Sequence, residues 1–217
     1  MMRRALLVFL AAGACRAHDP ITTKLTWTQE ISRIVYKRCV SCHYEGGRTP
    51  MSLLTYDDAR PWAKAVRDEV LARRMPPWGP VKGFGDFRND ASLSEPEIEL
   101  LVDWVEGGAP KGDDVYLPTP PKLAGKTEDT APAGRLSVAG VTTLRRDVTA
   151  IGVEPQGAVQ VTIERPDGSI EPLLWVRRYK PEEQPKAYYF RDAVRLPKGS
   201  RVRVEGGPAA LLLADGN

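Results

Sequence analysis

The sequence predicts a multidomain α plus β protein, with an all-α domain at residues 24–112 and an antiparallel β-sandwich-like domain at residues 134–217. Three observations lead to this fold class. Apolar residues recur at helical spacing in the first half of the chain and alternate with polar residues in the second half. Residues 113–133 between them are rich in proline, glycine and small polar residues and have no apolar period, which is typical of a semi-rigid linker.

Residues 1–17 have the pattern of a secretory signal peptide. Arg3 and Arg4 precede a short apolar run, and small residues follow it. This run is shorter than the ~20 apolar residues that a membrane-spanning helix needs. We therefore expect export to the periplasm. Cys15 follows "AAGA", which partly matches a bacterial lipobox, so a lipid anchor at Cys15 is a second interpretation that would tether the protein to a membrane.

The charge of the exported chain argues against one class of partner. The whole sequence carries a formal net charge of +3, but removal of Arg3, Arg4 and Arg16 with the signal leaves 28 basic residues against 28 acidic ones. Binding to nucleic acid needs a basic excess on one face. We therefore expect no nucleic acid partner.

Three helices are predicted in the first domain. The first starts with a capping box of Thr26 and Gln29 and runs into Cys39. The second covers residues 59–74, and the third starts with a capping box of Ser94 and Glu97 and ends at the glycines at 107 and 108. In the second domain, alternating patterns and turn sequences predict strands at residues 158–164, 170–176, 187–194 and 201–205.

The stretch "RCVSCHYEGG" at residues 38–47 concentrates two cysteines and a histidine within five positions. A redox dithiol is typically found at the start of a helix after a buried strand, whereas Cys39 and Cys42 follow the end of a predicted helix. A structural zinc site needs four ligands, and besides His43 the chain has only His18. Covalent haem attachment needs only two thiols at this spacing and an adjacent histidine. Haem is therefore the favoured reading, with zinc and an incidental dithiol as alternatives.

With this motif, residues 26–109 resemble a class I c-type cytochrome, in which a helix ends in "CVSCH" and a last helix, here "LSEPEIELLVDWVEGGAP", closes the fold. The resemblance implies one covalently attached haem c, with thioether bonds to Cys39 and Cys42 and with His43 on the iron. It also implies a second axial ligand, usually a methionine before the last helix. Met75 in "RRMPPWGP" is the better candidate, because Met51 lies only eight residues after His43.

Other side chains near the haem are weaker candidates. Pro50 resembles the proline whose carbonyl accepts a hydrogen bond from the ligand histidine, although it can equally be a turn residue. Several aromatic and basic side chains could reach the haem propionates, and each can equally be a core or surface residue. They are Trp62, Trp78, Arg48, Arg73 and Arg74.

Residues 140–205 of the second domain are similar to the carboxy-terminal β domain of copper type II, ascorbate-dependent monooxygenases. Those enzymes bind copper through histidine and methionine ligands. No histidine follows His43 and no methionine follows Met75 in this chain, so a copper site of that kind cannot form. The resemblance therefore implies a copper-free domain that serves docking or structure.

These features predict an electron carrier, and not an enzyme, that exchanges electrons with redox partner proteins. A methionine opposite the histidine closes the iron to other ligands. If Met75 does not bind the iron, the alternative is a haem enzyme or a gas or redox sensor with an open iron site.

Overall fold

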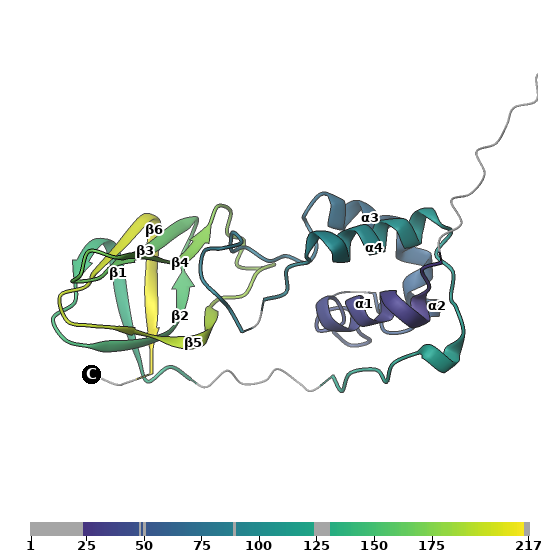
Figure 1. Ribbon diagram of the computed structural model, residues 1–217, viewed down its shortest axis with the longest axis horizontal. Helices are drawn as coiled ribbons and strands as arrows, with labels where there is room; N and C mark the ends of the chain where they lie inside the picture. Colours follow the sequence, from purple (N-terminus) through teal and green to yellow (C-terminus); the bar gives the residue numbers. More distant parts are fainter. Residues whose placement is uncertain (1–23, 48, 50, 89, 124–130, 215–217) are drawn as a thin grey trace, which may run out of the picture.

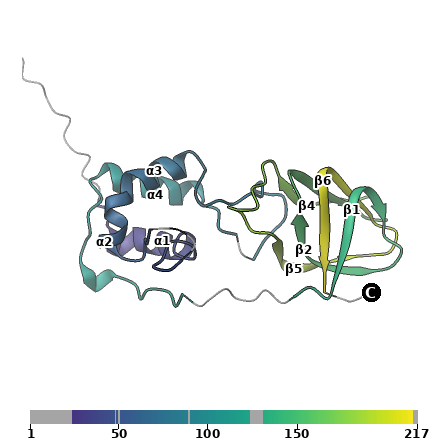
Figure 2. The same cartoon turned by 180° about the vertical axis from the view of Figure 1, so that it is seen from behind.

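The computed structural model describes residues 24–47, 49, 51–88, 90–123 and 131–214. Short helices form one lobe and six strands form the other (Figure 1). The view from behind shows the same two lobes, with the loop after α3 and the loop between β4 and β5 meeting between them (Figure 2). The α plus β class predicted from the sequence is confirmed. The predicted signal peptide and Cys15 lie outside the described residues.

The helical lobe consists of short segments, each of which begins where a side chain can cap it. Thr55 Oγ1 accepts a hydrogen bond from the Asp58 N–H at 3.1 Å, and the chain turns into a helix three residues earlier than predicted. A 3₁₀ turn that contains Pro61 then interrupts the predicted single helix. The helical segments are η1 (Trp27–Ile31), α1 (Ser32–Arg38), α2 (Tyr56–Ala59), η2 (Arg60–Trp62), α3 (Ala63–Leu71), α4 (Glu95–Glu106) and η3 (Asp114–Tyr116).

One of the two predicted capping boxes is confirmed and the other has a different partner. At α4, the Ser94 hydroxyl accepts from the Glu97 N–H and the Glu97 carboxylate accepts from the Ser94 N–H. At η1, Thr26 caps the Gln29 N–H as expected, but Glu30 accepts from the Thr26 N–H at 2.9 Å. The prediction of Gln29 as the reciprocal partner was wrong because η1 is a widened turn, which brings the following residue back over the cap.

The core of the helical lobe joins its first and last helices. Trp27 and Trp104 are almost fully buried, and their rings lie 6.0 Å apart. The Trp27 N–H and the Trp104 indole N–H both donate to the Pro110 carbonyl, at 3.0 Å and 2.9 Å. The segment after α4 is thereby held against the start of η1.

The β lobe is antiparallel throughout its described pairings. The strands are hydrogen-bonded in the order β4-β3-β6-β2-β5, and β1 also pairs with β6. Buried residues alternate along β3, as the sequence pattern indicated. The strands are β1 (Gly134–Thr143), β2 (Val148–Pro155), β3 (Val159–Glu164), β4 (Ile170–Val176), β5 (Tyr188–Leu196) and β6 (Arg201–Leu213).

A bend in β6 curls this sheet around its own core. The first half of β6 pairs with β3 and the second half pairs with β2, while β1 follows both halves. Gly206 at the bend has φ +91, and a Cβ there would lie 2.5 Å from the Ala158 carbonyl oxygen, so the position needs glycine. The sequence predicted a sandwich-like domain. The described strands instead form one curled sheet, because a single long strand serves both halves.

The loop between α3 and α4 leaves the helical lobe and packs on the β lobe. Phe87 from this loop is 4% exposed and belongs to the hydrophobic core of the sheet, and Trp78 packs against the same core. The loop therefore begins at one lobe and is held by the other, which decides how the site below is built.

Candidate haem site

The Cys-x-x-Cys-His motif forms a tight turn at the end of α1. Cys39 is the C-cap of the helix, and its carbonyl accepts hydrogen bonds from the Cys42 N–H at 3.1 Å and the His43 N–H at 3.0 Å. The Leu53 N–H donates to the His43 carbonyl at 3.0 Å, which brings the following loop back beside the motif. The turn thus holds Cys39, Cys42 and His43 close together on a short, well-bonded segment.

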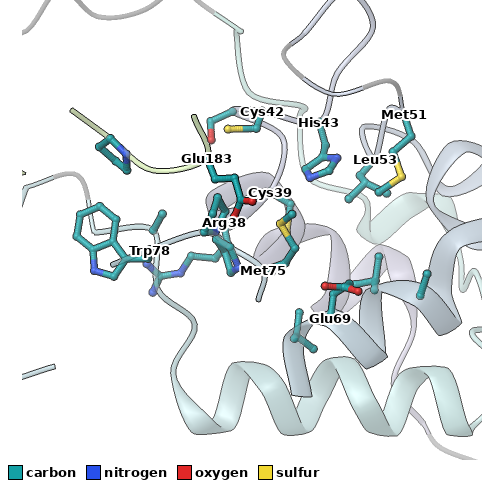
Figure 3. A pocket seen from close by; sticks show the side chains of 18 residues that line it. Arg38, Cys39, Cys42, His43, Met51, Leu53, Glu69, Met75, Trp78 and Glu183 are labelled. Atoms are coloured by element: carbon teal, nitrogen blue, oxygen red, sulfur yellow. The ribbon is translucent and has the colours of Figure 1, made fainter. Parts of the chain in front are cut away.

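All four site residues predicted from the sequence line one cavity of about 280 Å³. Cys39, Cys42 and His43 enter it from the motif, Met75 enters from the loop after α3, and Glu183 enters from the β lobe (Figure 3). Most of the remaining lining is apolar, which excludes water and suits a flat organic cofactor. This apolar lining consists of Met51, Leu53, Ala65, Val66, Val70, Pro76, Pro77, Trp78, Ala91 and Pro185.

Thr49 fixes the orientation of the His43 ring. Its Oγ1 lies 3.0 Å from His43 Nδ1 and 3.0 Å from the Cys42 carbonyl oxygen. The hydroxyl proton is donated to a carbonyl, so the oxygen can accept from an Nδ1–H group, and the Nε2 lone pair is then free to bind a metal. Burial lowers the pKa of His43, although a hydrogen bond to the Met51 carbonyl opposes the shift. The lowered pKa favours the neutral imidazole, which is the form that can bind a metal ion.

The sequence indicated Pro50 as a candidate support of this ring, with a simple turn proline as the alternative, and Pro50 lies outside the described residues. Thr49 was missed because a threonine in a loop carries no pattern of its own. Its role depends on how the loop folds back onto the Cys42 carbonyl.

The two thiols are free and not joined in a disulfide. Burial, with smaller contributions from Cys42 and Glu97, raises the pKa of the Cys39 thiol to about 12. A thiol that stays protonated at neutral pH is a poor nucleophile for disulfide exchange. The environment of Cys39 therefore disfavours the dithiol alternative and leaves a reduced thiol facing the cavity.

Two ion pairs each contribute one charged side chain to the lining of the cavity. Arg38 lines it, donates to the Asp90 carbonyl and forms a mostly buried ion pair with Glu97 at 3.1 Å, with exposed side-chain fractions of 14% and 17%. Glu69 lines the cavity and pairs with Arg74 at 2.7 Å. Sequence reasoning missed Arg38, because its carboxylate partner lies 59 residues further along the chain.

Of the weaker candidates from the sequence, one lines the cavity and others lie elsewhere on the protein. Trp78 lines the cavity, whereas Trp62 is 45% exposed on the surface. Arg73 pairs with Glu95 at 2.6 Å. Arg48 lies outside the described residues.

Two features of the described residues concern other kinds of site. Among them, no cluster of three or more His, Cys, Asp or Glu side chains is arranged to hold a metal ion. The haem site predicted from the sequence would need only one ligand of these types, so this result does not bear on that prediction. Within the same residues, no helix has the length and apolar character needed to cross a bilayer.

Comparisons with known proteins gave no match for this chain, whether with family models, curated proteins or solved structures. The resemblances to c-type cytochromes and to a monooxygenase β domain therefore remain predictions.

Proposed function

We propose that this protein is an exported monohaem c-type cytochrome that transfers electrons between redox partner proteins. One observation carries the proposal: two free thiols, an oriented imidazole and a methionine converge on a single apolar cavity. In this proposal Cys39 and Cys42 would hold the haem through thioether bonds, and His43 and Met75 would bind the iron.

The residues of the cavity fit such a group. The Cys39 and Cys42 thiols are not joined in a disulfide, as is needed before they add to vinyl groups. Thr49 forms a hydrogen bond with Nδ1 of His43, which leaves Nε2 available to the iron. A haem held between an imidazole and a thioether supplies one-electron transfer at a raised potential.

Met75 is a better ligand candidate than Met51 even though both line the cavity. Met51 belongs to the loop that folds back beside the motif, and its carbonyl bonds to Thr49 Oγ1 at 3.3 Å. It therefore enters from the same segment as His43. Met75 comes from a separate segment after α3, which supports its position opposite the imidazole.

The packing of the helical lobe also supports a cytochrome c fold. The segment η1, which runs directly into the motif-bearing helix α1, shares a core with α4 through Trp27 and Trp104. This arrangement fits the class I resemblance, in which a closing helix completes the domain.

Transient contacts between redox proteins are small, so a near-neutral chain can make them. We place the function in the periplasm, with either a free or a lipid-anchored amino terminus.

The visible spectrum of the protein, produced with haem-maturation machinery, tests the proposal. The wild type is expected to be low-spin and to show the weak sulfur-to-iron band in the ferric state. Its ferrous form is expected not to bind carbon monoxide. Met75→Ala is expected to lose the band and to bind carbon monoxide, whereas Met51→Ala, the matched control, retains the wild-type behaviour. A high-spin or carbon-monoxide-sensitive wild type would instead favour an enzyme or sensor with open iron.

A further inference from the structure

We propose that the β domain holds Met75 in place, and that Phe87 is the positioning residue through which it acts. This inference rests on the proposed function, since it concerns the same iron ligand. It gives the β domain a specific role, which is to keep the sixth coordination position closed.

The helical lobe supports Met75 from the residues that precede it, through the Arg73–Glu95 and Arg74–Glu69 ion pairs. Helix α3 ends at Leu71, and Arg73 at φ +55 turns the chain away from the helix axis. The Met75 N–H reaches only the Glu69 carbonyl, at 3.3 Å, and the side chain is 37% exposed. The next described anchors of this segment belong to the other lobe.

Backbone hydrogen bonds tie the loop to the edges of β4 and β5. The Val81 N–H donates to the Trp175 carbonyl at 2.7 Å, and the Arg88 N–H donates to the Tyr189 carbonyl at 3.1 Å. Such bonds add the loop to the sheet as short bridges, which fix its register against the strands. Further connections are the Pro80–Val176 and Phe87–Phe190 bridges, the Arg191 N–H to the Asp86 carbonyl at 2.9 Å, and the Arg191–Asp86 ion pair at 2.9 Å.

An aromatic cluster completes the attachment close to the cavity. Trp78, which lines the cavity, packs edge to face on Tyr188 with ring centroids 5.1 Å apart. Phe87 lies 5.8 Å from both Tyr188 and Phe190 and 6.0 Å from Trp78. Gly79 allows this close approach, because a Cβ there would lie 2.7 Å from the Tyr188 hydroxyl oxygen. Only two residues separate Met75 from Trp78, so the position of the aromatic cluster determines where Met75 can reach.

The β domain also reaches the cavity directly. Glu183 and Pro185, from the loop between β4 and β5, line the same cavity as Met75 and Trp78. Figure 3 shows Glu183 near the side chains of the Cys-x-x-Cys-His motif. The loop that carries Met75 is thus held between the end of α3 and the β lobe. If its anchor on the β lobe is lost, the population with Met75 away from the iron should rise.

Phe87 is a suitable residue for the test because it anchors the loop without lining the haem cavity. Phe87→Ala removes the anchor, and Phe87→Leu keeps an apolar side chain of similar bulk. Leu196→Ala is the matched control, since Leu196 is 1% exposed in the same β core. It lies six residues along β5 from Phe190, about 20 Å away.

The experiment compares the four full-length haem-loaded proteins by carbon monoxide binding to the ferrous form and by the sulfur-to-iron band of the ferric form. Phe87→Ala is expected to raise the rate of carbon monoxide binding about tenfold or more and to weaken the band. Phe87→Leu and Leu196→Ala are expected to stay within about twofold of the wild type. Hydrogen exchange of the amides of Val81 and Arg88 should accelerate in Phe87→Ala alone.

The possible failures can be told apart. Equal carbon monoxide binding in Phe87→Ala and Leu196→Ala, with a normal band in the wild type, would overturn the positioning role and leave the electron-transfer proposal standing. If Phe87→Ala does not fold, Phe87→Val takes its place as a milder truncation of the anchor, and carbon monoxide binding in Phe87→Val equal to that in Leu196→Ala would overturn the positioning role in the same way. A wild type without the band would overturn the ligand assignment itself, and with it this inference.

Discussion

The hydrogen bond between Thr49 and His43 predicts a measurable effect on the reduction potential of the proposed haem. Thr49→Val keeps the shape of the side chain and removes the oxygen that lies 3.0 Å from His43 Nδ1. A hydrogen bond accepted from Nδ1–H makes the imidazole a more basic ligand, which favours ferric iron over ferrous iron. Loss of this bond should therefore raise the potential.

The size of the effect follows from the strength of one neutral hydrogen bond, about 0.5–1.5 kcal/mol. Because ~1.4 kcal/mol corresponds to ~59 mV for one electron, the full loss amounts to about 20–60 mV. The Met51 carbonyl also accepts a hydrogen bond from His43 and can retain part of this interaction. We therefore expect an increase in the lower part of the range, about 20–40 mV.

Redox titration of the haem-loaded protein, followed in the visible spectrum, measures this shift. Thr49→Ser keeps the hydroxyl and is the matched control, with a potential expected within about 10 mV of the wild type. A lower potential in Thr49→Val, or equal shifts in the valine and serine variants, would refute the assigned role of Thr49.

Further predictions concern stability and attachment. Glu97→Ala removes the partner of Arg38 and half of the α4 capping box, and should destabilise the protein by about 1.5–3 kcal/mol at neutral pH in denaturant titrations. Burial alone would raise the pKa of Glu97, but the hydrogen bonds from Ser94 and Arg38 lower it below 4.5 on balance. A carboxylate whose pKa is lowered by folding stabilises the protein at pH values above its pKa in the unfolded chain. The difference in unfolding free energy between wild type and Glu97→Ala should therefore shrink as the pH falls below 4.5 and stay constant above about pH 5. A difference that grows on acidification would contradict this. Leu101→Ala, at a core position that is 1% exposed, should cost about 2–5 kcal/mol in the same assay, whereas an exposed change such as Glu99→Ala should cost little. Cys42→Ser should leave haem attached by one bond, through Cys39, which haem staining of a denaturing gel detects; a haem-free band with normal yield would contradict the attachment assigned to Cys39.

Local sequence signals predicted the elements that depend on short-range chemistry. The Ser94 and Glu97 pair marked the start of α4 because both partners of a capping box lie within one turn. Strands β3 and β4 were predicted within a residue of their observed bounds, since alternation and a Pro-Asp-Gly turn define them locally.

The elements that were missed depend on contacts between distant residues. Strand β1 has a mostly exposed pattern and contains glycines, and β2 was not recognised in "VTAIGVEP". The second half of β6 contains Gly-Gly-Pro, which indicates a turn in isolation and is a bend within one strand in the sheet. Only pairing with β1 and β2 resolves that ambiguity.

The same distinction applies to the candidate site. The spacing of Cys39, Cys42 and His43 is visible in one short stretch, and Met75 follows from the cytochrome resemblance. Thr49, Arg38 and the aromatic anchor at Phe87 act through partners that the fold brings near them. The involvement of the β lobe in the cavity was therefore not predictable from either half of the sequence alone.

The intact mass of the denatured full-length protein, produced with haem-maturation machinery, tests the central claim most directly. We predict a mass above that of the mature polypeptide by one haem, and its loss in the double variant Cys39→Ser, Cys42→Ser. A wild-type chain that carries no haem mass after denaturation would contradict the assignment of a c-type cytochrome.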